Sequence, residues 1–145
     1  MHKKRLLKLA DLLESDAKNK KGIKFDLGIW GITNGDGDDV VSCNTTACAV
    51  GLAAISGAFK RSGLSYRLTS SGRIEATLNG ECNHTSKFDG TFLNTMTFFE
   101  LSQREAEWLF TDDCYVGLPT TEAAGERAVA KRIRKFVAGK AAPNA

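Results

Sequence analysis

The stretch "SCNTTACAVGLAA", residues 42–54, decides how the rest of the chain has to pack. Four small residues recur in and just after it at helical spacing: Ala47, Gly51, Ala54 and Ala58. Such a stripe lets another backbone approach closely, and a helix that is apolar nearly all round lies in the centre of a fold. The pattern therefore predicts a central, buried helix over residues 45–59, which begins just after Cys43 and is capped by Asn44–Thr46.

Three further helices are predicted around this one. Leucines at helical spacing predict a helix over residues 3–19. Ser102 and Glu105 form a Ser-x-x-Glu capping box, which predicts a helix over residues 102–110. The last predicted helix covers residues 121–138, and residues 139–145 are expected to be a disordered tail.

A β-hairpin is predicted over residues 64–78, where apolar residues alternate on both sides of "TSSGR". A three-residue loop at 70–72 pairs residue 68 with 74, 66 with 76 and 64 with 78, so that all six apolar residues share one face. Gly72 then takes the left-handed conformation that such a loop requires. Asn79-Gly80 predicts a two-residue turn, and we expect further strands at about 81–86 and 91–97.

The order of these elements predicts an α+β domain with a small antiparallel sheet, spanning residues 1–145 as one unit. The extended segment "IKFDLGIWGI", residues 23–32, is expected to anchor Trp30 in the core. A chain of 145 residues can bury a sizeable core without crosslinks.

No part of the sequence predicts a membrane partner or export. The longest apolar run, residues 47–59, is shorter than the ~20 residues that a membrane span requires. Lys8, Asp11 and Glu14 interrupt the apolar N-terminal stretch, which argues against a signal peptide. We therefore expect a cytoplasmic protein with reduced cysteines.

Charge is distributed unevenly along the chain, although its net value is only +3. Residues 1–24 carry a net charge of +5, residues 25–120 carry −6, and residues 121–145 carry +4. The basic ends either attract nucleic acid or neutralise the acidic middle by packing on it, and we favour the second interpretation.

The catalytic candidates are Cys43, His84 and Glu75. A cysteine just before a helix is activated by the helix dipole and free N–H groups, and His84 would be its base, oriented by Glu75. Residue 75 pairs with residue 84 if Asn79-Gly80 makes a two-residue turn. The same pattern is compatible with a packed cysteine and a loop histidine, which is the interpretation we favour.

Metal sites are a further alternative, but we expect neither a metal nor a cofactor. Cys43, Cys48, Cys82 and His84, with or without Cys114, have the residue types of a zinc site. Cys48, however, falls on the apolar stripe of the predicted helix, which favours burial over coordination. Whether the four cysteines are free thiols, a disulfide pair or zinc ligands is left open by the sequence. The "NGDGDD" run at 34–39 does not match a calcium loop, because Asp39 and Thr45 stand where glycine and glutamate are required.

The ligand-binding candidates are Asn44, Thr45, Thr46 and Trp30. Backbone N–H groups at a helix start bind anions, and Trp30 with Asp36–Asp39 would complete a small pocket. The alternative, which we favour, is that the Asn and Thr side chains occupy these N–H groups themselves as caps.

"CNTTACAVGLA" resembles a Cys-(Gly/Asn)-Thr-x-(Ala/Gly)-Cys-x-x-Gly motif of small uncharacterised phage and bacterial proteins. These proteins also carry an upstream tryptophan, like Trp30, and a later element like "LSQREAEWLF", residues 101–110, before a final helix. The resemblance covers about residues 25–137 and departs at Asn44 and Leu52, where glycine and tryptophan are usual. It implies a phage-related origin, with a host-directed or ligand-sequestering role by association, and no assigned activity.

Together these observations favour a non-enzymatic module that binds a protein or a small-molecule partner. Two alternatives stay open, namely a cysteine hydrolase using Cys43 and His84, and a nucleic-acid binder that uses the basic terminal helices.

Overall fold

The computed structural model describes residues 1–19, 23–33, 45–83 and 90–143. Over these ranges the chain is a mixed α+β structure, as predicted, with five α-helices where the sequence predicted four. The helices are α1 (Lys3–Asn19), α2 (Ala49–Ile55), α3 (Gly90–Phe99), α4 (Gln103–Phe110) and α5 (Glu122–Val137). The strands are β1 (Lys24–Phe25), β2 (Gly31–Thr33), β3 (Thr45–Ala47), β4 (Leu64–Leu68) and β5 (Ile74–Leu78). Short 3-10 helices cover Lys60–Ser62 and Asp112–Cys114.

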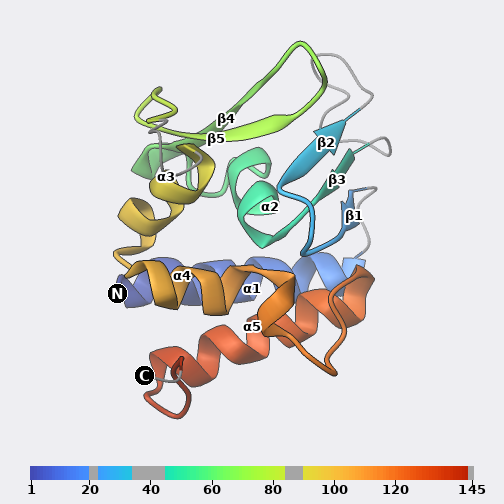
Figure 1. Cartoon of the computed structure of the whole chain (residues 1–145), viewed down its shortest axis with the longest axis vertical. Coiled ribbons are helices and arrows are strands. Elements are labelled where there is room, and N and C mark those ends of the chain that lie inside the picture. The colour runs from blue at the N-terminus through green and yellow to red at the C-terminus, as the bar shows by residue number, and fades with distance from the viewer. Residues whose placement is uncertain (20–22, 34–44, 84–89, 144–145) are drawn as a thin grey trace.

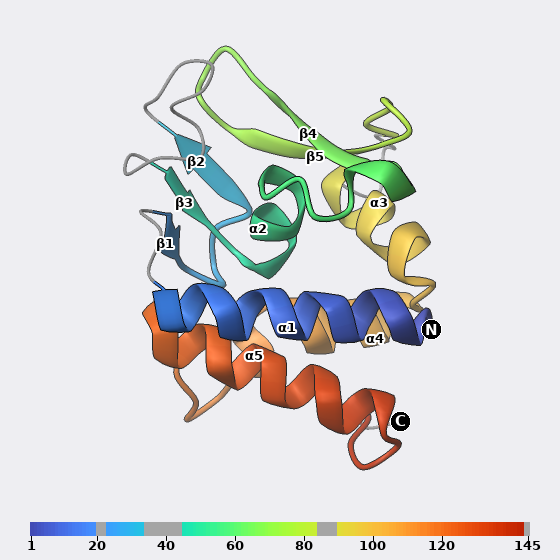
Figure 2. The same ribbon diagram turned by 180° about the vertical axis from the view of Figure 1, so that it is seen from behind.

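The helix α2 lies in the middle of the molecule, between a layer of helices and two small sheets (Figure 1). The long helices α1 and α5 lie side by side along one edge, with α4 next to them (Figures 1 and 2). The β4–β5 hairpin covers the opposite side of α2, and α3 packs against β5. Every residue of α2 is buried, which agrees with the predicted central position.

The start of the central helix was predicted wrongly. Thr45–Ala47 form β3, the middle strand of a sheet ordered β1-β3-β2, in which β1 is parallel and β2 antiparallel to β3. These residues pair on both sides, and β-branched threonines suit a strand better than a helix. The helix therefore begins only at Ala49 and ends at Ile55, before Gly57, which has a φ of 76°.

The small-residue stripe does admit a neighbouring backbone. A Cβ atom at Gly51 would lie 1.9 Å from the carbonyl oxygen of Trp30, so that only glycine fits here. The segment that leads into β2 thus lies directly against α2.

The hairpin register was predicted correctly. Leu64 pairs with Leu78, Tyr66 with Ala76 and Leu68 with Ile74, and Gly72 has a φ of 82°. The two-residue turn at Asn79-Gly80 is also present, since Leu78 and Glu81 exchange backbone hydrogen bonds of 2.9 and 3.1 Å. The apolar face is buried only in part, because Leu68 is 36% exposed near the hairpin loop.

The strand predicted at 91–97 is a helix, α3. Its buried side chains recur every three or four residues, as in Thr91, Asn94, Thr95 and Phe98, which is a helical period. Threonines and phenylalanines gave the segment the composition of a strand, but the helical spacing of its buried residues decides its conformation. The strand expected at 81–86 is represented by the single bridge between Leu78 and Glu81, and residues 84–86 lie outside the described residues.

The predicted helices at both ends and at 102–110 agree with α1, α5 and α4 within two residues. The capping box is formed as predicted: the Glu105 N–H donates to Ser102 Oγ at 3.2 Å, and the Ser102 N–H donates to Glu105 Oε2 at 2.9 Å. Under these helices four phenylalanine rings pack edge to face or tilted, with centroids 4.9–6.1 Å apart: Phe59, Phe98, Phe99 and Phe110.

Candidate functional site

Cys43, Asn44, His84 and Asp36–Asp39 lie outside the described residues. The predicted catalytic pair of Cys43 and His84, and the predicted role of Asn44 in ligand binding, therefore stay predictions. The remaining candidates, Glu75, Thr45, Thr46 and Trp30, have defined positions.

Cys48 is the residue that caps the central helix. Its Sγ accepts a hydrogen bond from the Gly51 N–H at 3.4 Å and donates one to the Trp30 carbonyl oxygen at 3.6 Å. The side chain is fully buried, and this burial raises the pKa of the thiol to about 11. Burial thus disfavours the reactive thiolate, and Cys48 packs in the core and caps the helix.

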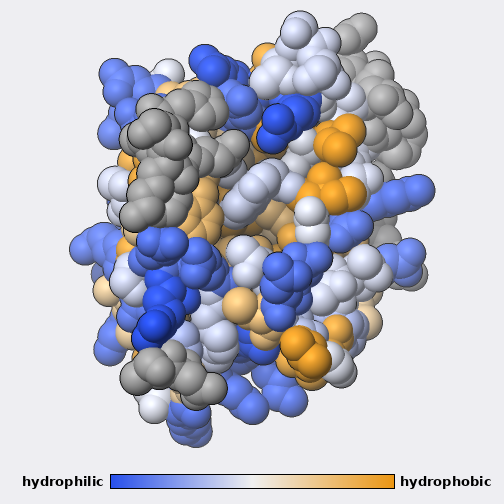
Figure 3. Space-filling model, in the orientation of Figure 1, coloured by the Kyte–Doolittle hydropathy of each residue, from blue (hydrophilic) through white to orange (hydrophobic). Residues whose placement is uncertain are grey.

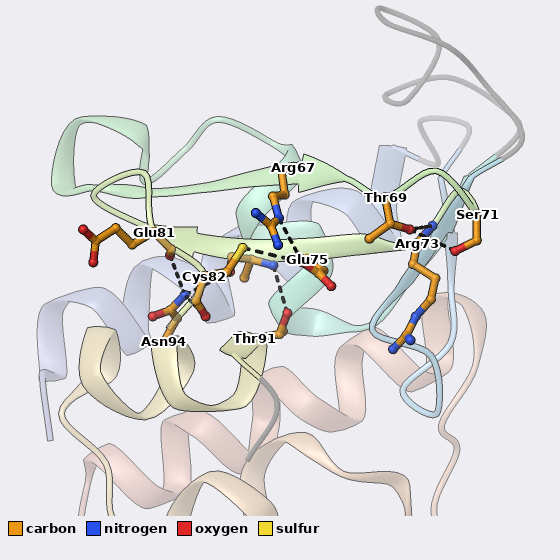
Figure 4. Close-up of polar contacts among 10 residues, drawn as sticks. Arg67, Thr69, Ser71, Arg73, Glu75, Glu81, Cys82, Thr91 and Asn94 are labelled. Atoms are coloured by element: carbon orange, nitrogen blue, oxygen red, sulfur yellow. Dashed lines mark hydrogen bonds and ion pairs between the residues drawn. The ribbon is translucent and has the colours of Figure 1, made fainter. Parts of the chain in front are cut away.

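Within the described residues, Glu75 contacts Arg67 and Cys82 (Figure 4), and its predicted contact with His84 stays a prediction. Its Oε2 lies 3.0 Å from Nε of Arg67, the residue opposite it in the hairpin, and accepts a 3.5 Å hydrogen bond from the thiol of Cys82. Beside this pair, the buried Asn94 amide donates to the carbonyl oxygens of Ala76 and Glu81, each at 3.0 Å. The cluster joins α3 to the end of the hairpin.

Thr45 and Thr46 lie in the middle strand and not at a helix start. Thr45 is buried, and its hydroxyl donates to Thr33 Oγ1 at 2.8 Å. Trp30 lines a small cavity of about 200 Å³, whose other walls are Leu27, Gly28 and Phe110–Asp113. The predicted pocket of Trp30, Thr45 and Thr46 includes Asp36–Asp39, which lie outside the described residues, so that it stays a prediction.

The three described cysteines belong to different elements. Cys48 precedes α2, Cys82 follows β5, and Cys114 lies in the 3-10 helix after α4, where it accepts a hydrogen bond from Thr111. Across residues 1–19, 23–33, 45–83 and 90–143, no group of three or more His, Cys, Asp or Glu side chains is placed to hold a metal ion.

A basic groove, which we call the α4–α5 groove, has a volume of about 500 Å³. Its apolar wall comes from α4 and the following segment: Trp108, Leu118 and Pro119. Its basic wall comes from α5: Arg127, Lys131, Arg132 and Lys135. Figure 3 shows hydrophobic surface over the segment that joins α4 to α5, where Val116 is 91% and Leu118 is 49% exposed.

Arg132 fixes the shape of this groove. Its Nη1 donates to the carbonyl oxygens of Trp108 at 2.9 Å and Cys114 at 2.8 Å. Its guanidinium lies 4.8 Å from the Trp108 ring centroid and 3.6 Å from that of Tyr115. Arg127, Lys131 and Lys135 have exposed side chains and no ion pair within the described ranges, so that their charges face solvent.

An acidic pocket, which we call the α1–α5 pocket, has a volume of about 320 Å³. It is lined by Asp16 of α1, Ile23–Phe25, and Glu122, Ala123 and Glu126 of α5. Gly125 lets these elements meet, because a Cβ atom there would lie 3.1 Å from the Phe25 ring and 2.6 Å from the Thr120 carbonyl carbon.

Glu126 is the unusual residue of this pocket. It is 4% exposed, and its Oε2 has no hydrogen-bond partner in the described part of the chain. Burial raises the pKa of Glu126 to about 9, and the neighbouring Asp16 carboxyl adds to the shift by hydrogen bonding and by its charge. The carboxyl group is therefore protonated at neutral pH.

The sequence analysis missed both cavities, although one signal was available. Glu126 stands three residues before Val129 and seven before Ile133, which places it on the buried stripe of α5. A charged residue on such a stripe indicates a buried carboxyl. Trp108 carries no comparable signal, since its position beside α5 depends on how the two helices pack.

No protein-family model, curated protein or solved structure matches this chain. None of the helices in the described residues is both long enough and apolar enough to cross a lipid bilayer.

Proposed function

We propose that the protein is a non-enzymatic cytoplasmic binding module that holds an acidic segment of a partner protein in the α4–α5 groove. The observation that carries the proposal is the pairing of an apolar wall with three solvent-facing cations in one groove. A nearly neutral chain that gathers Arg127, Lys131 and Lys135 along one helix face presents a local positive field to a partner.

A protein segment suits this groove better than a bare phosphate backbone. Leu118 lines the groove with the cations and is 49% exposed, and burying such a side chain favours a partner that brings its own apolar residues. Exposed apolar residues rimmed by polar ones are typical of protein-binding surfaces. A host-directed role, as the resemblance to phage proteins implies, fits such a surface by association.

The nucleic-acid alternative is supported by Trp108, an indole ring that lies beside the basic side chains and offers a stacking surface. The cysteine-hydrolase alternative has no comparable support, because Cys43 and His84 lie outside the described residues. The experiment below distinguishes binding of an acidic protein segment from binding of nucleic acid.

Trp108 is one of two tryptophans, so that a Trp30→Phe background makes it the sole indole reporter. We would titrate this protein with a synthetic peptide that alternates glutamate and leucine, and separately with a single-stranded oligonucleotide of equal charge. We expect a saturable change in Trp108 emission with the peptide and a weaker one with the oligonucleotide.

The double variant Lys131→Glu/Lys135→Glu should weaken peptide binding at least about tenfold. The matched control Lys60→Glu/Arg61→Glu makes the same change in net charge outside the groove and should leave binding unchanged. If both variants bind the peptide equally weakly, the α4–α5 groove is not the binding site. Tighter binding of the oligonucleotide, with a steep salt dependence, would replace the proposal by the nucleic-acid function.

A further inference from the structure

The α1–α5 pocket contains a buried polar atom that the described chain leaves unsatisfied. Glu126 lines the pocket, is 4% exposed, and has an Oε2 without a hydrogen-bond partner. Buried carboxyl oxygens almost always have a partner, because losing hydration without replacing it is costly. A donor from outside the chain would remove this cost.

The charged groups that face Glu126 define which donor fits. Asp16 approaches from α1, Lys24 from β1, and Glu122 and Arg127 belong to α5 itself. The pocket lining contains four ionisable side chains. Three of them are acids (Asp16, Glu122 and Glu126), and the fourth, Lys24, is exposed. Glu126 itself is neutral in the free protein, but the two other acids, Asp16 and Glu122, repel an anion and attract a cation.

The rest of the lining is apolar. Ile23, Phe25 and Ala123 offer hydrocarbon surface next to the carboxyl groups, and the volume of about 320 Å³ is of the size that holds a short alkyl chain with a polar head. No three His, Cys, Asp or Glu side chains are placed for a metal ion in the described part of the chain, which favours an organic cation.

We propose that the α1–α5 pocket binds a primary alkylammonium group, of a small amine or of a lysine side chain. The ammonium donates a hydrogen bond to Glu126 Oε2 and is attracted by Asp16, while the alkyl chain lies against Ile23 and Phe25. An ammonium has three donors, so that it can satisfy more than one carboxyl oxygen at once.

Binding is coupled to the loss of a proton. Free Glu126 is protonated at neutral pH because its pKa is about 9. An ammonium next to it favours the carboxylate, so that Glu126 releases its proton to solvent while the ligand keeps its charge. This site is independent of the α4–α5 groove, and its test does not depend on the proposed function.

The test is a titration of the whole chain with butylammonium, butanol and Nα-acetyl-lysine methylamide, followed by amide chemical shifts in NMR spectra. We expect saturable shifts at the pocket with butylammonium and at least about tenfold weaker binding of butanol. Stronger binding of the capped lysine than of butylammonium would identify a lysine side chain as the source, and the reverse would identify a free amine.

Glu126→Gln keeps the shape of the side chain and removes its ability to lose a proton, and we expect it to weaken butylammonium binding at least about tenfold and to abolish proton release. Proton release is measured by calorimetry in two buffers with different heats of ionisation. The control is Glu81→Gln, an exposed glutamate in the hairpin turn, which should bind as the wild type does. Asp16→Asn provides a second pocket variant, with the same expected direction, if Glu126→Gln does not fold.

Three results would overturn the proposal. Butanol could bind as tightly as butylammonium, which would leave only an apolar cavity. Butylammonium could fail to bind saturably at all, which would mean that water alone satisfies Glu126. Glu126→Gln and Asp16→Asn could both bind butylammonium as the wild type does, which would place the ligand elsewhere.

Discussion

Replacing Glu126 with glutamine should change how the free energy of unfolding depends on pH. Burial, with the neighbouring Asp16 carboxyl, raises the pKa of Glu126 in the folded protein from 4.5 to about 9. In the unfolded chain the group loses its proton near its ordinary value. Between these two values the folded state therefore binds one proton more than the unfolded state, and stability falls as the pH rises.

The magnitude follows from one proton. A difference of one bound proton changes the free energy of unfolding by about 1.4 kcal/mol per pH unit. The stabilisation that comes from protonated Glu126 is fully present in the free energy of unfolding below pH 4.5, and it is lost as the pH rises toward about 9. From about pH 6 to about pH 8, we expect the wild type to lose about 3 kcal/mol more stability than Glu126→Gln.

The assay is urea denaturation followed by circular dichroism at several pH values, on the wild type, Glu126→Gln and the exposed control Glu81→Gln. Titrating groups away from Glu126 are common to the wild type and Glu126→Gln, so that the difference between their profiles reports on Glu126 and its neighbour Asp16. The free energies of unfolding of the wild type and Glu126→Gln could instead change in parallel between about pH 6 and about pH 8. That result would refute the conclusion that Glu126 is buried and protonated. The control should follow the wild type.

Two further predictions concern the central helix. Gly51→Ala should destabilise the protein by about 3 kcal/mol, because the new Cβ would lie 1.9 Å from the Trp30 carbonyl oxygen. A denaturation midpoint close to that of the wild type would contradict this packing. Cys48 should be alkylated about a hundredfold more slowly in the folded than in the urea-unfolded protein at neutral pH, because a pKa raised from 9.0 to about 11 lowers the thiolate fraction by that factor. Mass spectrometry of the labelled peptides measures both rates, and labelling of Cys48 as fast as that of half-buried Cys82 would show that the helix cap is open.

Local rules predicted the parts of the fold that local chemistry decides. The capping box predicted the start of α4, and the alternation of apolar residues, with a left-handed Gly72, predicted the register of the hairpin. The helices α1 and α5 followed from helical spacing alone. In each case the deciding residues lie within a few positions of one another.

The wrong predictions concern residues whose conformation is decided by distant partners. Thr45–Ala47 form a strand because β1 and β2 flank them, and neither strand is a strong signal by itself, with two and three residues. The pocket at Glu126 and the groove at Trp108 likewise depend on how α5 packs against α1 and α4. Spacing in the sequence indicates which face of α5 is buried, but not which neighbouring helix that face meets.

The uneven charge of the chain overstates how much positive charge is available to a partner. Several basic side chains of the terminal helices are used within the fold: Arg5 bonds to the Phe98 carbonyl oxygen, Lys8 to that of Ala58, and Arg134 to Asp11 and Glu14. The Arg134 pairs hold α5 against α1, and hydrogen bonding to Arg134 lowers the pKa of Glu14. Arg127, Lys131 and Lys135 remain facing solvent on α5, next to Trp108 and Leu118. Lys3, Lys4 and Lys18 of α1 are exposed as well. What distinguishes the α4–α5 groove is therefore the apolar surface that lies beside its three cations.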